Sequence, residues 1–431
     1  MSVSIAGAPP RRRTTPVGLP RLLAGVNADR PASFGDHVAR HGLLPTGHRS
    51  DLIGAVEASG LRGRGGAGFP TAKKLRAVAD RPGKPVVLVN ATEGEPVSGK
   101  DSVLLRYAPH LVLDGACAVA NALGAREVLV AVAETAMRDR AALGDAIRAR
   151  EGASADGRIA IRLATTPEGF VVGEETALVN HLNGGPAKPT FKPPLPFERG
   201  VGDAPTLVQN AETLAHIALI ARYGPDWFRE VGTKEEPGSM LLTVAGAVAR
   251  PGVHEVALGS SFADLLVAAG GLTEAPRAFL IGGYFGTWVA AERAAGLVLS
   301  SAALQKLGAS LGAGGVFVLP VSACGVFETA RVMRYLADES AGQCGPCVHG
   351  LAAIAGGFER LARLDGTDMR PQLARWFELV NGRGACRHPD GAAHFAASAL
   401  AVFSDEVEHH LRYGRCSTPA APLLPVPRRH R

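Results

Sequence analysis

The sequence predicts an α/β protein in three parts: a layered α/β domain, a smaller unit of strands with one helix, and a C-terminal group of helices. Between about residues 50 and 230, short apolar β-rich runs alternate with helical segments, which is typical of a layered α/β domain. From Ser239 the order becomes strand, turn, strand, helix, strand. After Val326, four helical segments carry cysteines near their ends, which indicates a small bundle around a metal centre. The 431 residues, 46% of them hydrophobic, suffice for several cores.

The α/β domain shows this alternation element by element. We expect strands at 85–90, 127–132 and 159–163, and helices at 51–59, 111–123, 135–150 and 210–222, with one more beginning at Thr71. The first strand is followed by the polar residues Asn90, Glu93, Glu95 and Asp101. Ligands of open α/β sheets bind outside the carboxyl ends of strands, so this cluster is a candidate site. A solvated loop is the alternative.

Just ahead of that strand lies a glycine-rich stretch, residues 60–71. Five glycines fall within nine residues, and Lys73 and Lys74 follow at the start of the expected helix. Glycine lets the backbone approach a ligand closely, and the N-terminus of a helix favours anions. The stretch therefore predicts a phosphate-binding loop, with a ligand-free surface turn as the alternative. Further on, Gly173 precedes two adjacent carboxylates, Glu174 and Glu175, which form either part of a site or a simple acidic helix start.

The later elements set the expected domain boundaries. Strands at 240–246, 253–256 and 278–283 surround a helix at 261–269, and the C-terminal helices are expected at 327–340, 351–364, 371–382 and 391–414. The expected division is an arm at 1–48 with a short helix near 34–41, an α/β domain at 49–232, a second domain at 239–322, a helical domain at 326–414 and a disordered, proline-rich tail at 415–431.

Composition excludes several classes of protein. The net charge of +6 comes largely from arginines near both ends, and no aromatic-interleaved basic patch supports nucleic-acid binding. No signal peptide and no apolar run of spanning length is present, so we expect a soluble, cytoplasmic protein. The six cysteines are better explained as buried thiols or metal ligands than as disulfides, and Cys117 as an inert core thiol.

Several motifs occur together in one order. They are Gly63-Arg64-Gly65-Gly66-Ala67-Gly68-Phe69-Pro70-Thr71, Asn90-x-x-Glu93-Gly94-Glu95-Pro96, Lys100-Asp101, Gly173-Glu174-Glu175-Thr176-Ala177-Leu178, Lys192-Pro193-Pro194, Asn210-x-Glu212-Thr213 and Gly342-x-Cys344-x-Pro346-Cys347. Over residues 50–413 the chain resembles the NADH-binding flavoprotein subunit of respiratory complex I. The same family includes subunits of NAD-reducing hydrogenases and of NAD-dependent formate dehydrogenases.

This resemblance implies a fold and a reaction. The fold is a Rossmann-like FMN-binding domain, a ubiquitin-like β-grasp domain and a C-terminal four-helix bundle that holds a [4Fe–4S] cluster. The reaction is hydride transfer from NADH to FMN, followed by one-electron transfer to iron–sulfur centres. The partners are NADH and other redox subunits, including an iron–sulfur protein, with a membrane reached only through a larger complex.

The resemblance also implies roles for residues at matching positions. The loop Gly63, Arg64, Gly65, Gly66, Ala67 and Gly68, together with Lys74, is expected to hold the flavin phosphate, and Phe69 to contact the adenine. Asn90, Asp101 and Asn210 are expected to bind ribityl or ring groups. Glu93 and Glu95 are expected to line the flavin and nicotinamide region, and Gly173, Glu174 and Glu175 to position the nicotinamide end. The expected catalytic residues are Glu93, Glu95 and Glu175.

Two departures from the family pattern affect the iron–sulfur cluster and the NADH site. Ala341 stands where the first cluster cysteine is expected, leaving Cys344, Cys347 and Cys386. Three thiolates allow a [4Fe–4S] cluster with another fourth ligand, a [3Fe–4S] cluster, or loss of the cluster; the substitute donors considered are His349, His388, Cys324 and Cys416. Aromatic residues expected around the adenine are also missing, with Leu75, Arg76 and Ala77 at one place and Leu195 at another.

Three functions follow from these observations. The first is an FMN-containing NADH oxidoreductase subunit. The second is an FMN electron-transfer subunit whose donor is not NADH. The third is a degenerate, non-catalytic paralogue that serves as an assembly module.

Overall fold

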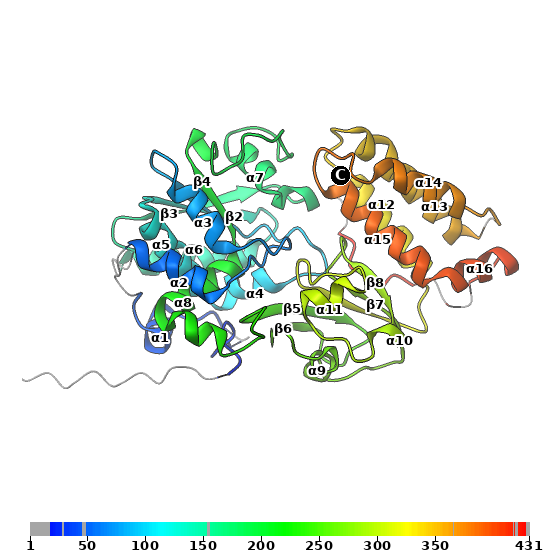
Figure 1. Cartoon of the computed structure of the whole chain (residues 1–431), viewed down its shortest axis with the longest axis horizontal. Coiled ribbons are helices and arrows are strands. Elements are labelled where there is room, and N and C mark those ends of the chain that lie inside the picture. The colour runs from blue at the N-terminus through cyan, green and yellow to red at the C-terminus, as the bar shows by residue number, and fades with distance from the viewer. Residues whose placement is uncertain are drawn as a thin grey trace, which may run out of the picture.

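The computed structural model describes residues 18–27, 30–44, 49–152, 156–364, 366–416, 418 and 421–427. Much of the expected arm, residues 1–17, 28–29 and 45–48, lies outside these residues, as does part of the tail. The described chain forms an α/β part, a second sheet and a group of helices (Figure 1). One cluster of buried hydrophobic residues lies mainly in the α/β part, a second lies within the second sheet, and a third joins that sheet to the helices. The helix expected near 34–41 is present as α1 (Phe34–His41), begun by a capping box at Ser33.

A four-stranded parallel sheet forms the centre of the first part. Its order is β3-β2-β1-β4, built from β1 (Val86–Asn90), β2 (Glu127–Ala133), β3 (Ala160–Thr166) and β4 (Thr206–Asn210). Runs of valine and leucine make β1 and β4 fully buried except at their last residues. Pairing of β1 with β4 places Asn90 beside Asn210 at the carboxyl ends of both strands. The strand β4 was not expected from the sequence, because it is only five residues long and is followed directly by the next helix.

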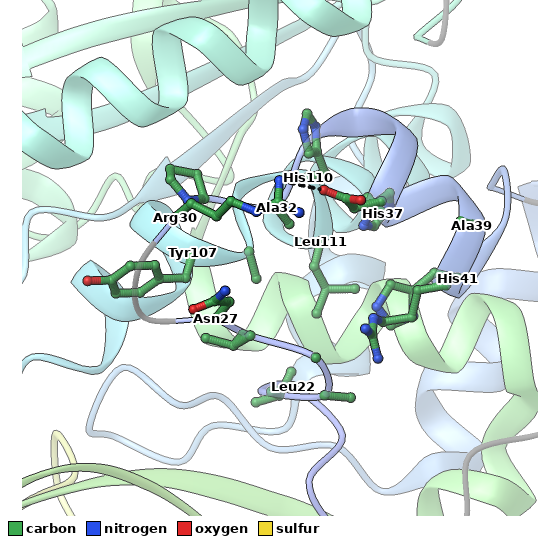
Figure 2. Close-up of a pocket in the computed structure, with 17 residues that line it drawn as sticks. Leu22, Asn27, Arg30, Ala32, His37, Ala39, His41, Tyr107, His110 and Leu111 are labelled. Atoms are coloured by element: carbon green, nitrogen blue, oxygen red, sulfur yellow. Dashed lines mark hydrogen bonds and ion pairs between the residues drawn. The ribbon is translucent and has the colours of Figure 1, made fainter.

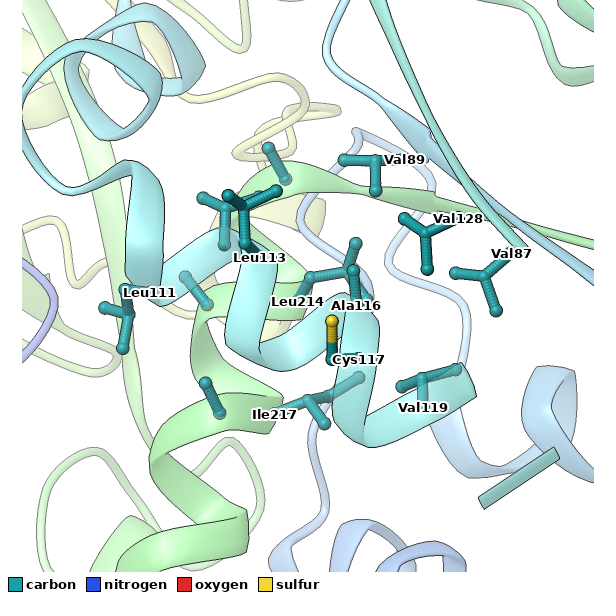
Figure 3. Packing of buried hydrophobic residues seen from close by; sticks show 14 of the residues in the cluster. Val87, Val89, Leu111, Leu113, Ala116, Cys117, Val119, Val128, Leu214 and Ile217 are labelled. Carbon is teal, nitrogen blue, oxygen red and sulfur yellow. The ribbon is translucent and has the colours of Figure 1, made fainter. Parts of the chain in front are cut away.

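Helices pack against the sheet and against one another. They are α2 (Arg49–Ser59), α3 (Thr71–Ala79), α4 (Lys100–Tyr107), α5 (Pro109–Leu123), α6 (Met137–Gly152), α7 (Glu175–Leu182) and α8 (Ala211–Arg229), with the short turns η1 (Phe170–Gly173) and η2 (Val201–Asp203). Gly115 lets α5 approach α8 closely, since a Cβ there would stand 1.8 Å from the Leu214 carbonyl oxygen. Figure 3 shows Leu214 packed with Ala116 and Cys117. Cys117 is 2% exposed, as expected for a core thiol.

The second part is a mixed five-stranded sheet in the order β6-β5-β9-β7-β8. The strands are β5 (Ser239–Gly246), β6 (Gly252–Ala257), β7 (Pro276–Ile281), β8 (Thr287–Ala290) and β9 (Gly315–Pro320), with α9 (Phe262–Ala268), α10 (Ala291–Ala294) and α11 (Ser301–Gln305) between them. The pair β5 and β9 is parallel and the other pairs are antiparallel. The expected strands and helix are present, and β8 and β9 complete the sheet.

The third part is helical. It contains α12 (Gly325–Asp338), the π-helical turn η3 (Pro346–Leu351), α13 (Ala352–Arg363), α14 (Arg370–Val380), α15 (His388–Val402) and α16 (Ser404–Tyr413). The expectation of one helix at 391–414 is wrong, because the chain breaks at Phe403. The Phe403 ring lies in the core, 5.2 Å from the Trp288 ring between centroids, and occupies the space beside Gly325.

The expectation of a disordered tail is wrong for residues 421–427. Leu424 is 2% exposed, and the Leu423 and Leu424 amides each donate to the Glu328 carboxylate at 2.9 Å. The tail is held because its two amides donate to a buried carboxylate whose other partner is Arg331, at 2.8 Å. In the part of the chain that the structure describes, no single helix is long and apolar enough to cross a membrane. Only the pair α4 and α5, taken together, has the length and composition of a spanning segment, and this pair is bent by 95°.

Candidate functional site

A cavity of about 750 Å³ opens at the carboxyl ends of β1 and β4, where the three parts of the chain meet. Its wall combines the glycine-rich stretch and the polar residues after β1 with Gly282 and Phe285 of the second part and Cys386 and His388 of the third. Cavities of this size bind cofactor-sized ligands. The fold therefore brings the predicted flavin residues and one predicted metal ligand to one place.

The glycine-rich stretch is a loop whose ends are held by the body of the domain. The Gly63 amide donates to the Phe69 carbonyl at 2.8 Å and closes the loop. The Arg64 amide donates to Thr213 Oγ1 at 2.9 Å, and the buried Arg64 guanidinium donates to the Ser239 carbonyl at 2.9 Å. Arg64 thus fixes the loop to α8 and β5 instead of reaching into solvent.

The middle of the loop keeps its amides free. Gly66 and Gly68 have φ of 109° and 59°, a conformation that glycine adopts without steric cost. No described residue accepts a hydrogen bond from the amides of residues 65–68. A Cβ on Gly65 would stand 3.3 Å from the Asn210 Cβ, so the loop packs against the end of β4. Successive unpaired amides of this kind attract anions.

The helix that follows the loop adds to this attraction. The helix α3 begins at Thr71 after Pro70, and no side chain caps its first turn. Thr71 Oγ1 is buried beside the cavity without a hydrogen-bond partner. Lys73 and Lys74 also line the cavity. An uncapped helix start with nearby lysines is a favourable place for a phosphate group.

A buried ionic network lies behind the loop. Lys100 Nζ lies 2.7 Å from Asp101 Oδ1, 3.0 Å from Glu212 Oε2 and 3.3 Å from Asn210 Oδ1. Asn210 Nδ2 donates to Asp101 Oδ2 at 2.6 Å. Although burial opposes ionisation, the Lys100 ammonium lowers the pKa of Glu212 to about 2. The network is therefore charged and holds Asp101 and Asn210 rigidly at the cavity wall.

The two carboxylates after β1 are held by backbone amides. Glu93 has φ of 40° and accepts from the Asp101 and Ser102 amides at 2.8 Å each, so it caps α4. Glu95 accepts from the Tyr284 amide at 2.8 Å and so joins the first part to the second. Burial raises the pKa of Glu93 and the pKa of Glu95 to about 7 each. Both therefore exchange a proton near neutral pH.

Four charged side chains alternate at the mouth of the cavity. Glu174 caps α7 by accepting from the Thr176 amide at 2.8 Å, and Lys192 Nζ lies 2.7 Å from its other oxygen. Glu175 lies between Lys74 at 3.0 Å and Lys192 at 3.9 Å. The predicted carboxylate pair and the predicted phosphate lysine thus meet, and each has an ionic partner.

Asn90 connects the end of β1 with the turn before this carboxylate pair. Its Nδ2 donates to the Gly173 carbonyl at 2.8 Å, and its Oδ1 accepts from Thr92 Oγ1 at 2.9 Å. A Cβ on Gly173 would stand 2.9 Å from Thr92 Oγ1. Glycine is therefore needed at 173 because the two segments are in direct contact.

The cysteines predicted to bind metal lie at one end of the helical part. Cys344 and Cys347 flank the start of η3, and Cys386 precedes α15. Burial, together with the neighbouring Cys344 and Cys386, raises the pKa of Cys347 to about 12. Ala341 is 3% exposed and offers no donor at the first position of the motif.

Comparison with known proteins relates each of the three parts to a described family. Residues 56–219 match the family described as Nuo51 FMN-binding domain, residues 328–410 the NADH-ubiquinone oxidoreductase-F iron-sulfur binding region, and residues 241–283 the SLBB domain. The chain is 33% identical over 385 residues to the second NADH-quinone oxidoreductase F subunit of Rhizobium meliloti, covering 85% of this chain and 90% of the relative. The chain belongs to the family of NADH-quinone oxidoreductase F subunits. The family recognised from the motifs is thus confirmed, with its FMN-binding and iron–sulfur regions.

Two further relatives agree with this assignment. The NADH-quinone oxidoreductase F subunit of Streptomyces coelicolor is 31% identical over 383 residues, covering 85% of this chain and 84% of that protein. One chain of an NAD⁺-reducing [NiFe]-hydrogenase superposes with a TM-score of 0.77 at 32% identity, covering 84% of this chain. The present chain spans only 63% of that hydrogenase chain.

The residues of this member of the F-subunit family fit FMN. Besides the free loop amides, four buried polar atoms at the cavity wall have no partner among the described residues: Arg64 Nε, Thr71 Oγ1, Gln209 Nε2 and His388 Nδ1. Buried polar groups are nearly always hydrogen-bonded in native proteins, so such atoms indicate a polar ligand. The cavity thus has both free amides suited to an anion and unpaired polar groups suited to the remainder of a cofactor such as FMN.

The three thiols fit an iron–sulfur cluster only in part. Three thiolate ligands are available at Cys344, Cys347 and Cys386, and Ala341 leaves one position without a protein donor. Cys324 does not supply it, because it begins α12 whereas Ala341 follows the end of that helix, about 21 Å away at 1.5 Å per residue. His388 Nε2 is 2.7 Å from the Leu336 carbonyl, and its buried Nδ1 has no hydrogen-bond partner among the described residues, so His388 stays among the substitute donors.

Sequence reasoning missed several aromatic residues at the site. Leu195 and Ala77 line the cavity at the positions where aromatic residues were expected and are absent. Phe197 also lines this cavity and supplies one aromatic side chain. Phe69 is 54% exposed at the same mouth. The Phe170 ring packs against Phe285 at 4.7 Å between centroids. No local pattern could indicate Phe285, because it comes from another part of the chain.

A second cavity, of about 500 Å³, lies between α1 and α5, away from the glycine-rich stretch (Figure 2). His37, His41 and His110 line it, and His37 Nε2 is 2.6 Å from Asp114 Oδ2. Asp114 also pairs with Arg150 and Arg222, so its charge is balanced within the protein. This cluster attaches α1 to the domain.

Proposed function

We propose that this chain oxidises NADH at a bound FMN and passes the electrons singly to iron–sulfur centres. The observation that supports this proposal most directly is that one cavity is lined by both the free amides of residues 65–68 and Cys386. A flavin supplies the chemistry for this, because it accepts two electrons and releases them one at a time. The protein supplies binding, orientation and access.

The loop and α3 hold the phosphate in this proposal. The amides of residues 65–68 donate to the phosphate oxygens, and Lys74 adds a positive charge at the mouth. Asn90, Asp101 and Asn210 orient the ribityl chain or the ring, because the Lys100 network holds them in place. Gly66 and Gly68 are needed so that the loop can take its shape.

The acidic residues have two proposed roles. Glu93 and Glu95 line the inner wall, where a pKa of about 7 lets each hold or release a proton near the ring. Glu174 and Glu175, balanced by Lys74 and Lys192, position the nicotinamide end at the mouth. Phe69 and Phe197 are proposed to contact the adenine, a smaller aromatic surface than the family pattern implies.

The exit for electrons is proposed to be the cysteine end of the helical part. Cys386 would hold a cluster together with Cys344 and Cys347, next to the flavin cavity. The cluster is [3Fe–4S], or [4Fe–4S] with a fourth ligand from outside the motif. Its electrons pass to an iron–sulfur partner protein, as the relatives' assembly in multi-subunit enzymes suggests.

We propose that the expected domain division holds: FMN domain 49–232, second domain 239–322 and helical domain 326–414. The mixed sheet with α9 across it is consistent with a β-grasp arrangement. The helices from α12 to α16 are consistent with a bundle. The match to the SLBB domain supports a separate second unit.

The decisive experiment is an anaerobic visible and electron paramagnetic resonance spectrum before and after NADH is added. We expect yellow protein that NADH bleaches, with a cluster signal on reduction. Gly65→Ala should lose flavin affinity by about tenfold, equal to 1.4 kcal/mol, because the added methyl group crowds Asn210 and displaces the loop. Gly54→Ala, in an open position of α2, is the matched control.

Other outcomes separate the alternatives. Protein that stays colourless after reconstitution with FMN contradicts the proposal and favours a non-catalytic assembly module. Bound FMN that NADH fails to bleach, but that NADPH or a reduced ferredoxin bleaches, shows a different donor. Bleaching without any cluster signal limits the chain to the flavin step.

A further inference from the structure

We propose that Cys324, Glu406, His410 and Cys416 form a structural zinc site at the far end of the helical part. One ligand atom from each of the four lies within 4.8 Å of all the others. Cys324 Sγ is 3.9 Å from His410 Nε2. In a tetrahedral zinc site, bonds of about 2.0–2.3 Å place neighbouring ligand atoms roughly 3.3–3.8 Å apart, so a contraction from the present spacing suffices.

The histidine already has the orientation and tautomer that a metal ligand requires. His410 is 2% exposed, and its Nδ1 lies 3.2 Å from the Leu361 carbonyl. A carbonyl only accepts hydrogen bonds, so Nδ1 carries the proton and Nε2 presents a lone pair toward Cys324. Metal-binding histidines are typically fixed by such a hydrogen bond from the second nitrogen.

The carboxylate is held equally well. Glu406 is 6% exposed and accepts from the Gly325 and Val326 amides at 3.2 and 3.3 Å. Arg277 lies 3.6 Å from Glu406 Oε2. Two thiolates and one carboxylate around Zn²⁺ carry one net negative charge, which this guanidinium balances.

The donor types select the metal. Two thiolates, one imidazole and one carboxylate form the mixed sulfur, nitrogen and oxygen set that zinc accepts in tetrahedral sites. Binding of Zn²⁺ replaces the two thiol protons, which are released to solvent.

This site is separate from the three cysteines near the flavin cavity. Cys324 begins α12, and Ala341 and Cys344 follow the other end of that helix, about 21 Å away. The four proposed ligands join the start of α12, the helix α16 and the segment after α16. A bound ion would thus fix the chain where it leaves α16, just before the tail turns back to Glu328.

Metal analysis of the full-length protein, produced with zinc and iron both supplied and purified under reducing conditions, tests the proposal. We expect about one zinc per chain in the wild type. Cys416→Ser should lose this zinc without losing iron, and it lies after the last helix, where the fold tolerates change. Cys117→Ser is the control cysteine and should keep the zinc.

A second comparison tests whether the zinc is bound instead by the cysteines near the flavin cavity. The double variant Cys344→Ser with Cys347→Ser should lose iron and keep its zinc. Cobalt added to the metal-free wild type should produce thiolate charge-transfer absorption that Cys324→Ser lacks. A chelator should lower the wild-type melting temperature but not that of Cys416→Ser.

Three results would overturn the proposal. The first is zinc below about a tenth of an equivalent per chain, since a structural site of this kind retains its metal through purification. The second is equal zinc in Cys416→Ser and Cys117→Ser. The third is a disulfide between Cys324 and Cys416 in the freshly purified protein.

Discussion

Lys74 Nζ lies 3.0 Å from Glu175 Oε2 across the mouth of the flavin cavity. Both side chains are 29% exposed, so the pair is accessible to a ligand. Lys74 follows the glycine-rich loop, and Glu175 begins α7 beside Lys192. The positive charge proposed for the phosphate is therefore shared with a carboxylate, and a bound cofactor competes with Glu175 for it.

This competition predicts opposite effects for the two partners. Lys74→Met should weaken FMN binding, whereas Glu175→Gln should strengthen it two- to fivefold, because a partly exposed ion pair is worth about 0.5–1 kcal/mol. Equilibrium titration with flavin fluorescence measures both. Equal weakening by the two substitutions would show instead that the pair acts as a unit that shapes the loop.

The contact between α5 and α8 predicts a strong effect on stability. Gly115→Ala would place a methyl group 1.8 Å from the Leu214 carbonyl oxygen, which backbone atoms of two packed helices cannot accommodate. We expect a loss of about 3 kcal/mol or more in the free energy of unfolding.

The control for Gly115→Ala is Gly356→Ala, in an open position of α13. There nothing lies within 4 Å of the added methyl, so stability should stay equal or rise by up to about 1 kcal/mol. Urea denaturation compares the two variants. A loss below about 1 kcal/mol in Gly115→Ala would mean that the helices can separate without cost.

Local patterns predicted the elements, and the motifs predicted which residues gather at the site. Asn90 and Asn210 were both expected at a cofactor site, but their pairing at the ends of β1 and β4 depends on a strand too short to recognise. The packing of Phe285 on Phe170 and the contact of Cys324 with His410 were beyond such reasoning for a different reason. The partners in each contact are distant in sequence, so no periodicity relates them, and only packing of whole domains brings them together.

The buried carboxyl group of Glu95 predicts a pH dependence. Its pKa is raised to about 7 by burial, so the folded state binds more protons than the unfolded state between about pH 4.5 and 7. Stability contributed by this group must fall as pH rises through that range. In Glu95→Gln the group no longer ionises.

Between pH 5 and pH 8, we therefore expect the free energy of unfolding of Glu95→Gln to rise by roughly 1–3 kcal/mol relative to that of the wild type. Thermal unfolding of the flavin-free protein at several pH values measures this change. Glu292→Gln, at an exposed position of α10, is the control and should run parallel to the wild type. Parallel curves for Glu95→Gln as well would show that its carboxyl group ionises normally.

Ala341 limits the iron–sulfur site, and restoring a thiol there should complete it. Ala341→Cys places a fourth sulfur three residues before Cys344, at the position that the family motif assigns to a ligand. With four thiolates, a [4Fe–4S] cluster needs no outside donor. We expect reconstituted Ala341→Cys to keep about four irons per chain through gel filtration with a chelator, whereas the wild type loses iron.

Ala337→Cys, one helical turn earlier in α12, supplies an equal number of thiols and should behave as the wild type. If all three proteins retain the same iron, the cluster is already complete and its fourth ligand lies elsewhere in the chain.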